Sequence, residues 1–300
     1  MCSNHSIIKT QILTLLLSVA FSTCFATIKS SAFITTWKTE IDNDDITIYV
    51  NPEFKTAYKY HIDWGDGYKE KNLTTNAMHR YAKAGVYIVK ITGDFPAIYS
   101  EAKYFKNAAK LQSIENWGAI KWQSMEKAFY GCTNLVYNAT DTPNLKKVTD
   151  MREMFVGARK FNGDISKWNV KNVIRMDHMF SSASSFNQDI GGWDVSNVWS
   201  MINMFSRAAS FNQDIGDWDV SKVRSMGEMF AYNTVFNQDI SNWDVSNVID
   251  MFSMFKNAEE FNQDLSDWET HNVTECKNFN TNSGLSLEKF PKAGNCFNKI

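Results

Sequence analysis

Tryptophan recurs every 25 residues over the second half of the chain, and the recurring positions are Trp168, Trp193, Trp218, Trp243 and Trp268. The surrounding sequence returns with it. Residues 186–211 read FNQDIGGWDVSNVWSMINMFSRAASF, and residues 211–236 read FNQDIGDWDVSKVRSMGEMFAYNTVF. A fixed period of this length indicates one supersecondary unit stacked on copies of itself, because a single unit cannot bury its own apolar face.

One phenylalanine marks each copy of the repeat, and the copies are found at Phe105, Phe129, Phe155, Phe180, Phe205, Phe230 and Phe255. A degenerate eighth copy follows at residues 276–279. We therefore expect an array of seven to eight repeats over residues 96–280, with residues 281–300 as a C-terminal cap or tail. Atypical terminal copies are expected, because an end unit must not expose its stacking face.

Two periodicities alternate within one unit. An apolar spacing typical of a helix of two to three turns is found at Val198, Met201, Met204, Phe205, Ala208 and Phe211. The alternation in residues 218–220 predicts a short strand with Asp219 facing outward. One strand and one helix per repeat predicts an α/β leucine-rich-repeat-like solenoid.

Residues 27–95 differ in character from the repeats. Three β-branched runs, at 46–50, 58–64 and 86–91, are separated by turn residues and predict a β-sandwich. The phrases YHIDWGDG (60–67) and HRYAKAGVYIVKITG (79–93) resemble the polycystic-kidney-disease (PKD) domain. That resemblance implies an immunoglobulin-like extracellular module.

The repeat itself resembles the BspA-like leucine-rich-repeat family of bacterial surface proteins, in the subtype known from mycoplasma lipoproteins. The motif F-N-Q-D-I-x-x-W-D-V-S-N-V-x-x-M-x-x-M-F-x-x-A carries the resemblance, and it is almost fully present at 186–208, 211–233 and 236–258. The 161–183 copy departs from it at Gly163 and Asn169. The resemblance implies a secreted or lipid-anchored surface protein linked to adhesion.

The N-terminus is typical of a secretory signal peptide. Lys9 precedes an apolar run over 12–20, and small residues follow it, so we expect residues 1–26 to be removed after Ala26. A lipid anchor at Cys24 and a retained membrane span are the alternatives. Export permits disulfides. We expect Cys132 to be a buried free thiol, and we hypothesise a bridge between Cys276 and Cys296 that ties the tail over the last repeat.

Several side chains recur once per repeat, and each recurrence has a structural interpretation. The methionines and tryptophans are interpreted as core, with one partner needed for each indole N–H. The carboxylates of Asp164, Asp189, Asp214, Asp239 and Asp264 could accept backbone N–H groups in a turn, or they could bind calcium between repeats. The column of Asn187, Asn212, Asn237 and Asn262 is interpreted as a hydrogen-bonded ladder.

A second polar column is the candidate binding surface. It is expected to point from the predicted strands to solvent, and it consists of Asp194, Ser196, Asp219, Ser221, Asp244 and Ser246. A merely solvated strand face is the alternative. The turn at Asp63 and Asp66 is interpreted as stabilised by these carboxylates, with calcium as the alternative.

The predicted function is non-enzymatic binding at or outside the cell surface, with the repeat array as the interaction face. A net charge of −2 gives no reason to expect nucleic acid as partner, and no catalytic motif or dedicated metal site is recognisable. An extracellular protein or a glycan is the expected partner, and no cofactor is expected beyond the calcium alternative. The alternative function is a structural or spacer role in the cell envelope, without a specific ligand.

Overall fold

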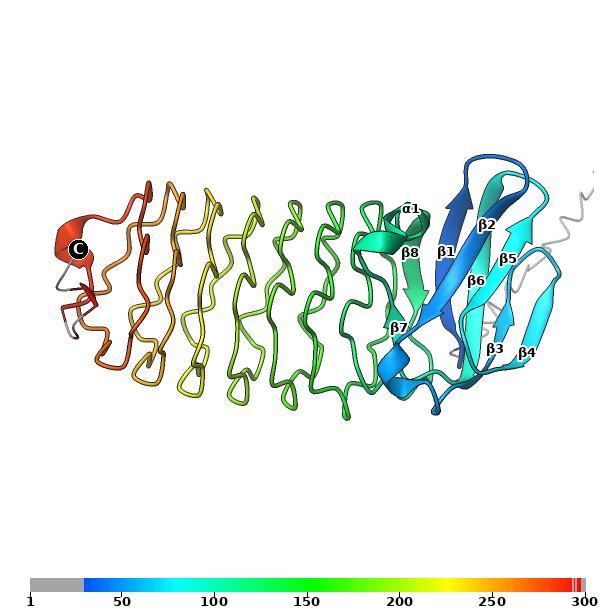
Figure 1. Ribbon diagram of the computed structural model, residues 1–300, viewed down its shortest axis with the longest axis horizontal. Helices are drawn as coiled ribbons and strands as arrows, with labels where there is room; N and C mark the ends of the chain where they lie inside the picture. Colours follow the sequence, from blue (N-terminus) through cyan, green and yellow to red (C-terminus); the bar gives the residue numbers. More distant parts are fainter. Residues whose placement is uncertain (1–29, 293, 295, 298–300) are drawn as a thin grey trace, which may run out of the picture.

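The computed structural model describes residues 30–292, 294, 296 and 297, so the predicted signal peptide (1–26) and Cys24 lie outside the described residues. A β-sheet part is followed by a long row of stacked coils (Figure 1). The strands are β1 Phe33–Thr39, β2 Asp44–Val50, β3 Lys59–Asp63, β4 Lys69–Leu73, β5 Ala77–Tyr81, β6 Gly85–Asp94, β7 Ile98–Tyr99, β8 Leu111–Asn116 and β9 Val136–Tyr137. The helical segments are α1 Phe105–Ala108 and three 3-10 turns at Pro52–Phe54, Ala102–Tyr104 and Leu287–Lys289.

Two sheets form the N-terminal part. The six-stranded sheet has the order β4-β3-β6-β1-β8-β9, and the three-stranded sheet has the order β5-β2-β7. Burial alternates along β1, so that Phe33, Thr35 and Trp37 face the core while Ile34 and Thr36 are partly exposed. β2, β3 and β6 lie where the three β-branched runs of the sequence predict strands.

The six-stranded sheet continues directly into the first coils. β8 pairs antiparallel with β1 on one side and parallel with β9 on the other. Gly118 lies against the backbone of Ala32, where an added Cβ would come within 2.4 Å of the Ala32 carbonyl oxygen. The β-sheet part therefore covers the first coil as its N-terminal cap and shares one core with it.

The predicted fold class is wrong, because the repeats contain no α/β leucine-rich-repeat solenoid. Among the described residues the only α-helix is α1, which has 4 residues and precedes the regular copies. The segment predicted to be helical, 198–211, is a succession of turns. Each copy contributes one coil, and neighbouring regular coils are joined by one parallel bridge and by further backbone hydrogen bonds, without forming strands.

The backbone hydrogen bonds explain why these turns do not form a helix, because successive N–H groups alternate between the next coil and a turn of their own coil. The N–H of Phe205 donates to the Met229 carbonyl of the next coil at 2.9 Å, whereas the N–H of Met204 closes a turn on Met201 at 3.2 Å. Left-handed φ angles of 55° at Asn203 and 59° at Arg207 interrupt any helix. Turns of three residues still bring every third or fourth side chain inward, so the burial pattern imitates that of a helix.

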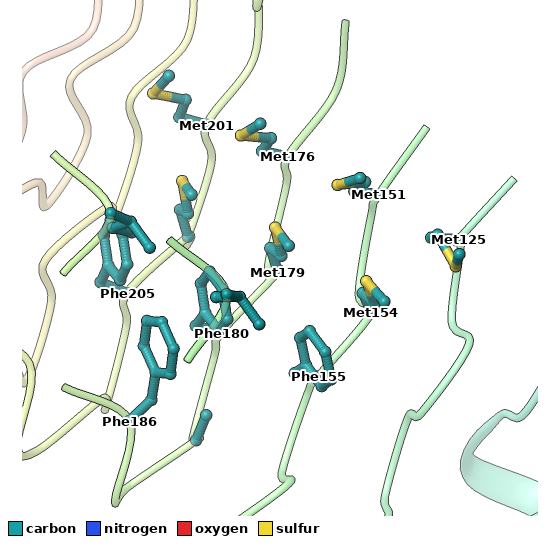
Figure 2. Close-up of a cluster of buried hydrophobic side chains, with 14 of the residues drawn as sticks. Met125, Met151, Met154, Phe155, Met176, Met179, Phe180, Phe186, Met201 and Phe205 are labelled. Atoms are coloured by element: carbon teal, nitrogen blue, oxygen red, sulfur yellow. The ribbon is translucent and has the colours of Figure 1, made fainter. Parts of the chain in front are cut away.

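The core of the coils consists of stacked columns of methionine and phenylalanine (Figure 2), as the sequence predicted. Phe180 and Phe205 lie 5.8 Å apart with an interplanar angle of 4°. The five tryptophans that recur every 25 residues are buried as well, and each of their indole N–H groups has a partner in the preceding coil. Trp193, for example, donates to the carbonyl of Ile165 at 3.1 Å.

The C-terminal end of the stack is closed by the tail. A disulfide joins Cys276 to Cys296, which confirms the predicted bridge. Phe290 and Phe297 pack edge-on against Phe279 of the last coil, and Phe279 is fully buried. Both ends of the stack are therefore covered. No helix in the described ranges is long and apolar enough to cross a membrane.

Candidate functional site

The candidate binding residues of the sequence lie on exposed turns rather than on strands. The strand predicted at 218–220 is absent, because Ser221 turns back and donates its N–H to Asp219 Oδ1 at 3.1 Å. The hydroxyl of Ser221 donates to the same oxygen at 2.6 Å. Equivalent turns recur in the neighbouring coils, and together the six residues form what we call the Asp–Ser rows: Asp194, Ser196, Asp219, Ser221, Asp244 and Ser246.

Each carboxylate in the Asp–Ser rows is held in place from one side only. The hydroxyl and N–H of Ser196 both contact Oδ1 of Asp194, and they hold the pKa of this carboxyl below its usual value. Oδ2 makes no hydrogen bond within the described residues, and the Asp side chains are exposed. The rows thus present oriented negative charges, repeated once per coil.

The other repeated polar columns have the structural roles expected of them. Oδ1 of Asp214 accepts the N–H of Gly216 at 3.0 Å, and the same turn recurs at Asp164, Asp189, Asp239 and Asp264. Oδ1 of Asn187 accepts the N–H of Asn212 at 3.0 Å, which confirms the asparagine ladder. Within the described residues, no group of three or more His, Cys, Asp or Glu side chains could hold a metal ion.

Two predictions for residues outside the repeated columns are also confirmed. Cys132 is a buried free thiol, and burial raises its pKa. Asp63 and Asp66 stabilise their turn by accepting the N–H groups of Gly65 and Tyr68 at 3.1 Å and 3.0 Å. In addition, Asp66 Oδ2 contacts His79 Nε2 at 2.7 Å.

Sequence reasoning missed a second surface, which follows the parallel bridges from coil to coil. We call the bridging residues the bridge row: Asp150, Arg175, Ser200, Ser225, Asp250 and Glu275. The residues just before them form the outer row: Thr149, Ile174, Trp199, Arg224, Ile249 and Thr274. After Thr149, each residue of the outer row donates its N–H to the carbonyl of the preceding one, as Trp199 does to Ile174 at 3.0 Å, so the row is a regular ladder.

The outer row carries large apolar side chains that the described part of the chain leaves exposed. Ile174, Trp199 and Ile249 are 38%, 42% and 46% exposed. The guanidinium of Arg175 lies over the indole ring of Trp199, 5.3 Å from its centroid, so the bridge row and the outer row share one surface. We call this surface the bridge face.

Ion pairs fix the polar side chains of the bridge face. Arg175 Nε contacts Asp177 Oδ2 at 3.0 Å, and the hydroxyl of Ser200 donates to the other oxygen of Asp177. One coil earlier, Arg152 contacts Asp150 at 2.6 Å and Glu126 at 3.2 Å. Burial raises the pKa of Glu126 despite this arginine.

The two surfaces differ in how their residues change from copy to copy. The Asp–Ser rows repeat the same two residue types in three consecutive coils, whereas on the bridge face no two coils carry the same pair of outer-row and bridge-row residues. A surface that repeats presents one chemistry many times, and a surface that varies presents one particular pattern. A search for residues that recur every 25 positions therefore finds the Asp–Ser rows and misses the bridge face.

Comparison with known proteins gives one match. The model of a protein family described as "Mycoplasma protein of unknown function, DUF285" matches three overlapping stretches, at residues 99–201, 123–232 and 190–286. Together these stretches span the coils and part of the tail. No curated protein and no solved structure matches the chain.

Proposed function

The chain belongs to this family of unknown function, whose model covers more than half of its residues, and we propose that it is a secreted or cell-surface binding protein, adhesin-like and without enzymatic activity. The stacked coils are its interaction surface. Its partner is an extracellular protein or glycan that presents positive charge. The resemblances to BspA-like surface proteins and to PKD domains support an extracellular location, as does the signal peptide proposed for residues 1–26.

The observation that carries this proposal is the geometry of the Asp–Ser rows. Turn hydrogen bonds hold the carboxylates of Asp194, Asp219 and Asp244 in one orientation, with one oxygen free toward solvent. Binding of a partner then costs little side-chain entropy, because these carboxylates are already ordered. Coils joined by backbone hydrogen bonds lie about 4.8 Å apart, so a multivalent partner can contact several carboxylates at once.

The charge of the coils supports a positively charged partner. Residues 175–274 contain 15 acidic and 5 basic side chains, a net charge of −10, although the whole chain has a net charge of only −2. An acidic surface of this size attracts cationic groups and accelerates association, most strongly at low ionic strength.

An array of extracellular-matrix proteins and glycans tests the proposal, probed with the purified chain in the presence and absence of calcium. The decisive variant is Asp194→Asn/Asp219→Asn/Asp244→Asn, because Asn keeps an oxygen for the turn and loses only the charge. The matched control, Asp189→Asn/Asp214→Asn/Asp239→Asn, removes the same charge from the neighbouring column.

We expect saturable binding by the native chain, at least tenfold weaker binding by the variant in the Asp–Ser rows, and a smaller loss for the control. Equal losses of affinity in both variants would show that binding depends on the overall charge of the coils and not on the Asp–Ser rows. The absence of saturable binding across the array would favour the alternative function, a structural component of the cell envelope without a specific ligand.

A further inference from the structure

We propose that two copies of the chain pair through the bridge face, with their stacks antiparallel. The two-fold axis would cross the face between the coils of Trp199 and Arg224. Exposed apolar side chains in a regular row, together with charged neighbours, are the composition of a protein interface. The sequence of the rows identifies the occupant as a second copy, because the pattern is complementary to its own reverse.

The symmetry fixes which residues would meet. The coils follow one another along a nearly straight line (Figure 1), so two faces can lie against each other over several coils. A two-fold axis in the plane of the face and perpendicular to the stack reverses the order of the coils and leaves each row opposite itself. Such an isologous contact requires each residue to suit the one at its mirrored position.

The outer row meets this requirement at its four central positions. Trp199 would lie opposite Arg224 of the second copy, and Arg224 opposite the second copy's Trp199, which gives two cation–π pairs. Ile174 would lie opposite Ile249, which gives two apolar contacts. These isoleucines and Trp199 are the large apolar side chains that the row leaves exposed.

The bridge row meets it with opposite charges. Arg175 would lie opposite Asp250 of the second copy, and the two-fold axis makes this pair occur twice. The central residues of the row, the buried Ser200 and the half-buried Ser225, place no charge at the axis. The paired region spans four coils, because at the next position Asp150 would face Glu275. Asp150 is already paired with Arg152 of its own chain.

Charge exchange tests both the pairing and its register. In Arg175→Asp the symmetric contact becomes two Asp–Asp pairs, and in Asp250→Arg it becomes two Arg–Arg pairs. We expect each variant alone to weaken dimerisation about 100-fold, because like charges then face each other twice. An equimolar mixture of the two variants restores both opposite-charge pairs and should dimerise like the native chain. Arg175→Asp also removes the ion-pair partner of Asp177 in its own chain, so the folding of each variant is checked separately.

The measurement is sedimentation velocity of the full chain over a concentration series, with thermal unfolding to verify that each variant is folded. Arg159→Asp and Asp217→Arg make the same charge changes at exposed positions outside the bridge face and should leave dimerisation unchanged. A native chain that stays monomeric overturns the proposal. So does a dimer that both variants leave intact, or one that their mixture fails to restore. The experiment needs no ligand, so its outcome is independent of the function proposed above.

Discussion

The indole N–H of Trp218 donates to the carbonyl oxygen of Ile190 at 3.1 Å, across the boundary between two coils. The same bond links Trp243 to Ile215 at 3.0 Å and Trp268 to Ile240 at 3.2 Å. A side chain that is almost fully buried thus adds a second donor to a carbonyl that already closes a turn, since the Ile190 carbonyl also accepts the backbone N–H of Trp193 at 3.1 Å. These bonds connect neighbouring coils through the core, in addition to the backbone bonds between the coils.

Trp218→Phe should therefore lower the free energy of unfolding by more than the smaller volume of the side chain alone would. The substitution removes the hydrogen bond between the two coils and leaves the Ile190 carbonyl with the backbone N–H of Trp193 as its donor, which costs about 0.5–1.5 kcal/mol. Urea-induced unfolding followed by circular dichroism measures this difference. Trp199→Phe is the matched control, because Trp199 is 42% exposed and its change should stay within about 0.5 kcal/mol. Equal losses in both variants would contradict a role for the indole N–H.

Glycine at position 182 should stabilise the protein. Ser182 has a left-handed φ of 59°, and two earlier copies carry Gly131 and Gly157 at the equivalent position. A residue with a Cβ costs about 1 kcal/mol in this conformation, so Ser182→Gly should raise the free energy of unfolding by up to about that amount. Ser185→Gly, at an exposed position outside the left-handed region, should give no gain. Unfolding midpoints of the two variants decide between these outcomes.

Removal of the disulfide should loosen the C-terminal end of the stack. Cys276 and Cys296 are separated by 20 residues, a loop for which a bridge contributes about 3 kcal/mol. The double variant Cys276→Ser/Cys296→Ser should unfold at lower temperature and be cleaved by protease first within the tail. Peptide mapping without reductant should recover the linked pair, with Cys132 unmodified in the folded protein. Two free thiols at 276 and 296 would contradict this account.

Acid should weaken the turns of the Asp–Ser rows. The Ser196 hydroxyl and N–H lower the pKa of Asp194, and Ser246 lowers that of Asp244 in the same way. A folded-state pKa below the unfolded value gives a stabilisation that is present above the ordinary Asp pKa of 3.8 and is lost as the pH falls through the folded-state pKa. Carbon-detected NMR titration of these carboxyls measures both pKa values. Ser196→Ala and Ser246→Ala should return them toward 3.8, and unchanged values would remove the serines as the cause.

Most of the core could be predicted from the sequence, because burial leaves a regular trace. Trp218, Met201 and Phe205 recur at the period of the coil, and all are buried. The turn-capping role of Asp214 and the ladder of Asn212 follow from the local hydrogen bonds that these side chains form. The bridge between Cys276 and Cys296 was predicted from the register of the repeats and the position of the tail.

The helix could not be distinguished from successive turns by apolar spacing alone. In both structures every third or fourth side chain points inward, and only the backbone angles at positions such as 203 and 207 separate them. One feature of the sequence does distinguish successive turns from a helix. Gly131 and Gly157 stand at the position of Ser182 and Arg207, where a helix interior would disfavour glycine.

The bridge face could not be predicted because no pair of outer-row and bridge-row residues recurs from coil to coil. Ile174, Trp199 and Arg224 share a position but no chemistry, so a search for recurrent residues passes over them. Their relation becomes visible only when the backbone ladder places them in one row. The Asp–Ser rows were found by their recurrence, although they lie on turns and not on the predicted strands.

The salt dependence of binding tests the central claim most directly, namely that the Asp–Ser rows bind a positively charged extracellular partner. The affinity for the strongest partner on the array would be measured over a series of ionic strengths for the native chain and for Asp194→Asn/Asp219→Asn/Asp244→Asn. The account predicts that native affinity falls steeply with salt, whereas the variant binds more weakly and with a shallower slope. Equal affinities and equal slopes for the two proteins would contradict it.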